Sequence, residues 1–283
     1  MLRSEPPVGA QESADVARLL NAGCAILASS VLADSSMEHY RGSFENKAMF
    51  VPPIVSTLAL IASLHGASDR SARAERRRDA IYALSAAAAA AGFGFHLYNV
   101  GKRDGGFCWE NFFYAAPIGA PWALLLSGTL GVAAERVRDT RPGGIPHIFG
   151  IAAGRLLAGL TSAGLLGTVG EVWLLHFRGA FQDPFMYLPV TLPPVGAGLL
   201  ASAALSSKPK KRPLTRFWMK LVTVLGLAGM GFHIYGVHRN MGGWRNWSQN
   251  VLNGPPIPAP PSFTGLGLAG LAALRLLEGP KNE

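Results

Sequence analysis

The chain has 283 residues, of which 49% are hydrophobic and only 15% charged, and its formal net charge is +9 at pH 7. Soluble domains usually carry about 25% charged residues. No Ser-His-Asp order, phosphate-binding loop, Cys-x-x-Cys pair or nucleic-acid-binding motif is present. The composition therefore gives no support to a soluble enzyme or a nucleic-acid-binding protein, and it leaves open whether the chain is an enzyme at all.

Eight apolar stretches are long enough to cross a membrane, because a spanning helix needs about 20 mostly apolar residues. They lie near residues 16–37, 49–66, 80–100, 116–135, 149–175, 187–206, 217–237 and 261–277. The proline-rich segment 253–261 cannot be regular helix, because proline lacks the amide donor. The pattern predicts an all-α integral membrane protein with eight transmembrane helices in contact with the lipid bilayer.

Positive charge alternates between the connections. The connections richest in arginine and lysine lie at 70–78, 136–141 and 208–216, whereas the intervening ones hold one or two basic residues each. Basic loops favour the cytoplasmic side. We therefore expect a protein of the bacterial inner membrane with both termini in the cytoplasm, as an even number of spans requires. This orientation explains the net positive charge of the chain, so we expect no nucleic acid as a partner.

The first half of the sequence recurs in the second half at a constant offset of 137 positions. The segments that match begin at Arg18 and Arg155, at His39 and His176, at Ala91 and Ala228, and at Gly105 and Gly242. We predict two tandem four-helix repeats, 16–138 and 151–278, related by a pseudo-two-fold axis along the membrane normal. Residues 1–15 form a cytoplasmic tail, 139–150 a cytoplasmic linker and 279–283 the C-terminal tail.

The repeat retains few polar residues, and these are the candidate site. Two histidines per half lie at the outer ends of helices, namely His39 with His96, and His176 with His233. The repeat also retains an acid five residues before the first histidine of each half and an arginine two residues after it: Asp34, Arg41, Glu171 and Arg178. Ionisable groups inside a span usually mark function. Tyr98 and Tyr235 follow the second histidines and fit a membrane-interface belt equally well.

Glycines accompany both sets of histidines. Gly42 and Gly179 follow the first set and are candidates for left-handed residues that cap the helix C-terminus. Gly92, Gly94, Gly229 and Gly231 precede the second set, where they fit close helix packing or the approach of a flat macrocycle. Three further histidines, His65, His147 and His238, are not repeated and are interpreted as structural.

Three functions fit this pattern. In the first, two imidazoles from two helices bind haem b in each half, with Arg41 and Arg178 at the propionates. A variant replaces haem by a non-haem transition metal with Asp34 and Glu171 as ligands or as partners of the histidines. The second function is a non-catalytic anchor or scaffold in a larger membrane complex, and the third is a parallel-repeat transporter. We favour a redox component that meets a protein partner on the outer face or in such a complex.

Overall fold

The computed structural model describes residues 5–114, 117–206 and 209–278, and helices make up most of it. Each of the eight predicted stretches contains a helix. These helices are α1 (Ala10–Arg41), α2 (Val51–Ser68), α3 (Arg76–Gly101), α5 (Gly119–Arg138), α6 (Ala153–Arg178), α7 (Leu188–Leu205), α8 (Pro213–Arg239) and α10 (Pro261–Glu278). The all-α prediction is confirmed for the described residues.

Six helical segments are long and apolar enough to cross a membrane, and they contain α1, α2, α3, α6, α7 and α8. Large aliphatic side chains on their outer faces are exposed, such as Ile61 on α2 (60%) and Val224 on α8 (59%). Apolar exposure of this extent along a helix is explained by contact with lipid rather than water. The helices therefore indicate a membrane protein.

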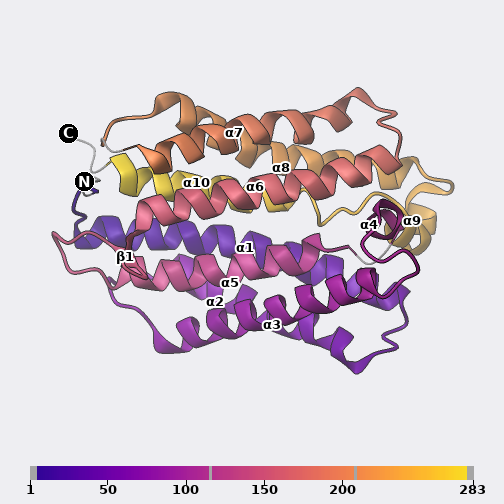
Figure 1. Ribbon diagram of the computed structural model, residues 1–283, viewed down its shortest axis with the longest axis horizontal. Coiled ribbons are helices and arrows are strands. Elements are labelled where there is room, and N and C mark those ends of the chain that lie inside the picture. The colour runs from indigo at the N-terminus through magenta and orange to yellow at the C-terminus, as the bar shows by residue number, and fades with distance from the viewer. Residues whose placement is uncertain (1–4, 115–116, 207–208, 279–283) are drawn as a thin grey trace.

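The core lies between four central helices, α1, α5, α6 and α10, with α2 and α3 along one side and α7 and α8 along the other (Figure 1). Small residues let the central helices approach closely. A Cβ atom on Gly23 of α1 would lie 2.7 Å from the carbonyl oxygen of Gly265 on α10, and one on Gly265 would lie 2.8 Å from that of Gly23. Backbone contact between two glycines is a common means of helix association in membranes.

Two short helices were not predicted. Helices α4 (Trp109–Tyr114) and α9 (Trp247–Asn253) lie at the end of the bundle that holds the four histidines of the candidate site (Figure 1). Three 3₁₀ turns complete this end: η1 (Lys47–Phe50), η2 (Pro184–Tyr187) and η3 (Gly243–Asn246). As predicted, the segment between α9 and Pro261 is not helical. Asn111 of α4 and Asn250 of α9 donate side-chain hydrogen bonds to the preceding loops, so these asparagines hold the loops in place.

Helix α6 begins four residues after the predicted start at residue 149. A small hairpin of β1 (His147–Ile148) and β2 (Ile151–Ala152) precedes α6, because Phe149 and Gly150 adopt left-handed backbone angles that end any helix there. Glu5 then accepts hydrogen bonds from the amides of Gly154 (3.0 Å) and Arg155 (2.8 Å). A carboxylate from the N-terminal segment thus satisfies the free donors at the start of α6.

Both cysteines are free. Cys24 is buried in α1, and Cys108 is partly exposed before α4. Disulfide bonding plays no part in this fold.

Candidate functional site: four histidines at one end of the bundle

The first histidine of each half is anchored to the backbone by the same contact. The Nδ1 atom of His39 lies 2.6 Å from the carbonyl oxygen of Met49, and that of His176 lies 2.7 Å from the carbonyl oxygen of Met186. The accepting carbonyls belong to the 3₁₀ turns η1 and η2, which begin the next helix in each half. Each imidazole therefore ties the end of one long helix to the start of the next.

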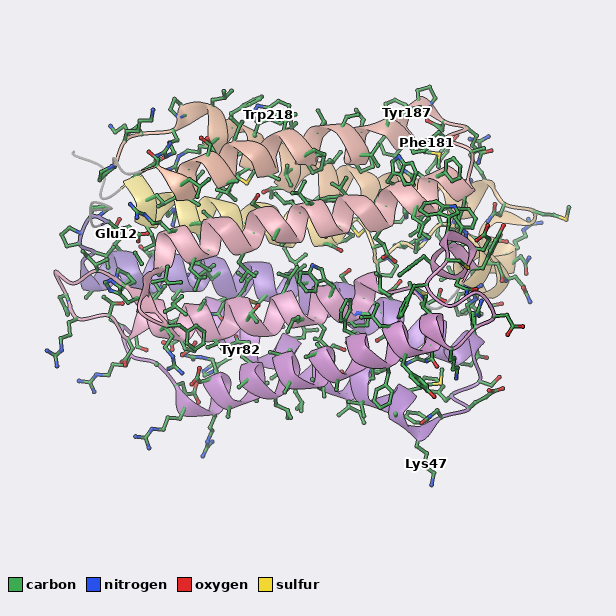
Figure 2. The ribbon with its side chains drawn as sticks, viewed as in Figure 1. Glu12, Lys47, Tyr82, Phe181, Tyr187 and Trp218 are labelled. Carbon is green, nitrogen blue, oxygen red and sulfur yellow. The ribbon has the colours of Figure 1, made fainter. Side chains whose placement is uncertain are left out.

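The chain reverses after these histidines through two consecutive left-handed residues. They are Ser43 and Phe44 in the first half and Ala180 and Phe181 in the second, with φ between 46° and 55°. Left-handed angles at residues other than glycine are strained and gather at functional sites. The turn places each phenylalanine ring edge-on to the histidine, with ring centroids 6.1 Å and 6.0 Å apart (Phe181 is labelled in Figure 2).

The prediction that Gly42 and Gly179 are left-handed caps is wrong, because both have φ = −82° and the turn comes one residue later. These glycines instead provide room. A Cβ atom on either would lie 3.1 Å from the methyl carbon of Met49 or Met186 respectively. The same two methionines provide the carbonyls that bind the histidines, so glycine allows the turn to close on the imidazole.

The second histidine of each half is also bound to a carbonyl. His96 near the end of α3 makes a short hydrogen bond through Nδ1 to the oxygen of Pro117, and His233 near the end of α8 makes one of 2.7 Å to the oxygen of Pro256. Proline provides a free carbonyl here because these segments are not helical. These contacts tie α3 and α8 to the segments that lead into α5 and α10.

All four imidazoles share one protonation pattern. A carbonyl oxygen can only accept a hydrogen bond, so the bonded Nδ1 atom carries the proton. In a neutral imidazole the other nitrogen, Nε2, then keeps its lone pair. A histidine that binds a metal through Nε2 usually donates its other N–H to a carbonyl or a carboxylate. The hydrogen bonds thus leave each ring in the tautomer that a metal ligand requires.

The four histidines fall into two pairs, one in each half. His39 lies within electrostatic reach of His96, and His176 lies within reach of His233. Each pair joins the first and third long helices of its own half.

The two arginines of the candidate site differ in their surroundings. Arg41 forms an ion pair of 2.7 Å with Glu38 and lines an open hollow of about 650 Å³ between the end of α1 and α9. The guanidinium of Arg178 lies over the rings of Phe113 and Tyr114, with its central carbon 5.5 Å and 5.9 Å from their centroids. Helix α4 therefore covers the end of α6, whereas the end of α1 faces open space.

Asp34 and Glu171 are near each other in the bundle. Their charges lie within electrostatic reach between α1 and α6. The carboxyl group of Glu171 packs against Gly119 at the start of α5, where a Cβ atom would lie 2.7 Å from its carboxyl carbon. The described part of the chain holds no group of three or more His, Cys, Asp or Glu side chains placed to hold a metal ion.

The glycines before the second histidines serve two purposes. A Cβ atom on Gly229 would lie 2.9 Å from the Pro260 ring, so this glycine allows close packing. Gly94 and Gly231 have no heavy atom within 4 Å of such a Cβ, so they leave open space at the helix surface. Tyr98 and Tyr235 are exposed, with the side chains of Lys102 and Arg239 over their rings, which fits a belt at the membrane interface.

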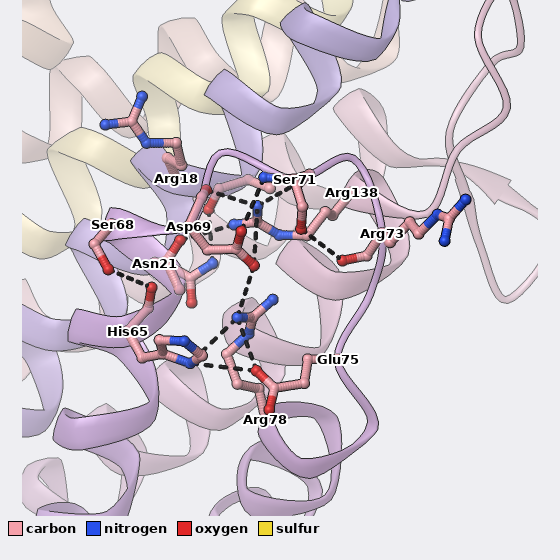
Figure 3. Close-up of polar contacts among 12 residues, drawn as sticks. Arg18, Asn21, His65, Ser68, Asp69, Ser71, Arg73, Glu75, Arg78 and Arg138 are labelled. Atoms are coloured by element: carbon pink, nitrogen blue, oxygen red, sulfur yellow. Dashed lines mark hydrogen bonds and ion pairs between the residues drawn. The ribbon is translucent and has the colours of Figure 1, made fainter.

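Sequence reasoning missed a polar network at the opposite end of the bundle (Figure 3). Arg78, only 2% exposed, bonds through Nε and NH2 to Glu135 at 2.9 Å and 3.1 Å and through NH1 to Asp69 at 2.9 Å. Arg138, fully buried, donates to the carbonyls of Gly66, Asp69 and Ser71 at 2.7–2.8 Å. The sequence feature that could have indicated this network is Glu135, an acid at the end of an apolar stretch. Its partner Arg78 lies in the basic connection 70–78 and was interpreted only as a charge that sets the orientation.

The three remaining histidines contribute nothing to the candidate site. His65 lies 3.2 Å from Glu75 at the edge of the polar network, His147 contacts the backbone of the hairpin, and the ring of His238 stacks on Trp244. The side chains that define the site remain the two histidine pairs. Comparison of the chain with protein-family models, with curated proteins and with solved structures found no match.

Proposed function

We propose that the protein is a membrane redox component that holds one haem b in each half, between His39 and His96 and between His176 and His233. The observation that carries the proposal is the shared hydrogen bond from Nδ1 to a backbone carbonyl. It fixes four imidazoles with Nε2 available, and two such nitrogens are the axial ligand set of a b-type haem. Such a haem transfers single electrons.

Other residues fit the same role. Arg41 and Arg178 are placed beside the first histidine in sequence and carry the charge that binds propionates. We favour haem over a non-haem metal because a haem iron needs only two ligands from the protein. A non-haem metal would draw on the same histidines with Asp34 and Glu171.

The hydrogen bonds also favour a second function, that of a non-catalytic anchor or scaffold. In that role the imidazoles only donate hydrogen bonds that hold the outer segments in place, and Nε2 binds no ligand. The two functions differ in what an asparagine at the same positions would do. Its side-chain amide nitrogen lies where Nδ1 lies and can donate to the carbonyl, but it does not replace imidazole as a haem ligand. Haem content of the purified chain, determined after extraction, tests the proposal: about two haems per chain support it.

The architecture that we propose has eight spans, formed as two tandem four-helix repeats related by a pseudo-two-fold axis. It is supported by the eight long helices and by contacts that recur at the repeat offset, such as those of Gly42 and Gly179. In this arrangement both termini and the basic connections face the cytoplasm of a bacterial inner membrane, and the histidines face the outside, where a protein partner would dock.

Fusion of a topology reporter tests this orientation. A reporter placed after Arg212 is expected to report a cytoplasmic position, because the loop before α8 is among the basic connections. A reporter placed after Gly243 is expected to report an external one. Alkaline phosphatase and green fluorescent protein, which are active on opposite sides, serve as mutual controls. Equal signals at both positions would contradict the proposed topology.

A further inference from the structure

In the connection between α2 and α3, the negative side chains are paired with arginines of the fold, whereas most of the positive ones are exposed. Residues 69–79 contain three carboxylates, and each is bound to an arginine of the fold. Asp69 and Glu75 contact Arg78 at 2.9 Å and 3.0 Å, and Asp79 contacts Arg136 at 2.7 Å. Arg78, which binds both Asp69 and Glu75, is buried, so these two carboxylates are paired with a charge inside the protein.

The remaining charged residues of this segment point outward. Arg70, Arg73, Arg76 and Arg77 are all exposed. With the neighbouring carboxylates already paired, these four guanidinium groups form a positive patch that local acids do not neutralise. The patch also surrounds the start of α3, where the helix macrodipole is positive. We call these four side chains the arginine patch.

The segment that carries the arginine patch is fixed in place. Arg138 donates to the carbonyls of Gly66, Asp69 and Ser71, and the amide of Glu75 donates to Glu135 at 2.8 Å. Although partial burial opposes ionisation, hydrogen bonds from Ser71 and Arg78 lower the pKa of Asp69 to about 2. Asp69 therefore stays ionised at neutral pH, and the network that anchors the segment persists (Figure 3).

The helices below the arginine patch present an apolar surface. Ile61 and Leu64 near the end of α2 are 60% and 57% exposed, and Leu84 on α3 is 53% exposed. Leu84 lies seven residues after Arg77, which places both on nearly the same face of the helix. A positive patch directly above an exposed apolar face matches a molecule with an anionic head and a hydrocarbon tail.

We propose that the arginine patch and the apolar faces of α2 and α3 bind an anionic phospholipid. The phosphate of the headgroup accepts hydrogen bonds from the guanidinium groups, and the acyl chains lie along Ile61, Leu64 and Leu84. A juxtamembrane arginine near an anionic lipid surface contributes about fivefold in affinity. This site lies at the opposite end of the bundle from the histidines, so it does not depend on the haem proposal.

The test measures lipid preference in the full-length protein. The purified chain is equilibrated with equal amounts of phosphatidylglycerol and phosphatidylcholine, and the retained lipid is quantified by native mass spectrometry. The wild-type protein is expected to retain phosphatidylglycerol at least tenfold over phosphatidylcholine. The variant Arg70→Gln, Arg73→Gln, Arg76→Gln, Arg77→Gln is expected to lose that preference.

The matched control removes four exposed positive charges at the other end of the bundle: Lys102→Gln, Arg103→Gln, Arg239→Gln and Arg245→Gln. It is expected to keep the wild-type preference. Equal retention of the two lipids by the wild-type protein would overturn the proposal, as would an unchanged preference in the arginine-patch variant or an equal loss in the control.

A salt titration of the wild-type protein tests the same point without substitution, because screening should reduce the preference. A preference that is insensitive to salt would contradict the site.

Discussion

Replacing Glu135 with leucine is expected to lower the free energy of unfolding by about 3–5 kcal/mol, the largest effect on stability that we predict for a single substitution. Glu135 is fully buried and accepts two hydrogen bonds from Arg78 and one from the amide of Glu75. The substitution leaves a buried guanidinium without its bidentate partner, and the cost of a buried charge without that partner is large. Unfolding in a denaturing detergent, followed by circular dichroism, provides the measurement.

Glu278→Leu is the matched control for Glu135→Leu. Glu278, 8% exposed, pairs with Arg216 at the corresponding end of α10 and accepts a hydrogen bond from the amide of Arg212, but the Arg216 side chain is 31% exposed, so we expect a smaller loss of about 1–2 kcal/mol. A second substitution, Arg78→Met, should recover part of the stability lost in Glu135→Leu, because it removes the unpaired charge. If Glu135→Leu unfolded within about 1 kcal/mol of the wild-type protein, the network would not have the stabilising role described.

Replacing the histidines is expected to have the largest effect on cofactor content. His96→Ala and His233→Ala should each remove one of the two proposed haems, and the double variant should bind none, because each pair supplies both axial ligands. His238→Ala is the control, since its ring stacks on Trp244 outside the pairs. Haem content and visible absorption of the purified variants provide the measurement.

Asparagine at the same positions separates the two proposed functions. The Nδ2 atom of asparagine lies where the imidazole Nδ1 lies, so His96→Asn keeps a donor for the carbonyl of Pro117 but provides no imidazole nitrogen. If the histidine binds haem, this variant should fold and lack the haem of the first half. If the histidine only pins the outer segment, the variant should resemble the wild-type protein in every respect, and that result would favour the scaffold function.

The sequence predicted the helices well because lipid imposes a simple rule on them. Each apolar stretch near the predicted positions holds a helix, since a chain in hydrocarbon must satisfy its backbone hydrogen bonds internally. The rule weakens where the chain leaves the apolar stretches. Hydropathy alone could not reveal that Phe149 and Gly150 form a hairpin before α6, nor that α4 and α9 lie across the ends of the long helices.

The candidate site was predicted in part. The repeat singled out the four histidines because two copies of one segment retain them, and all four are hydrogen-bonded through Nδ1 at the same end of the bundle. It could not identify the partners of Nδ1, because those are backbone carbonyls of Met49, Met186, Pro117 and Pro256, and a carbonyl has no sequence signature. It also could not reveal the Glu135 network. From Pro117 and Pro256 onward the offset between the halves is 139, so Glu135 aligns with Leu274 and the second half does not retain the acid.

The absorption spectrum of the detergent-purified protein, recorded oxidised and then reduced and accompanied by elemental analysis, tests the central proposal most directly. The proposal predicts a Soret band that shifts on reduction, the sharp visible bands of a low-spin haem with two histidine ligands, and about two iron atoms per chain. A folded protein that is colourless and free of metal would contradict it, and a protein with metal but no Soret band would exclude haem in favour of a non-haem site.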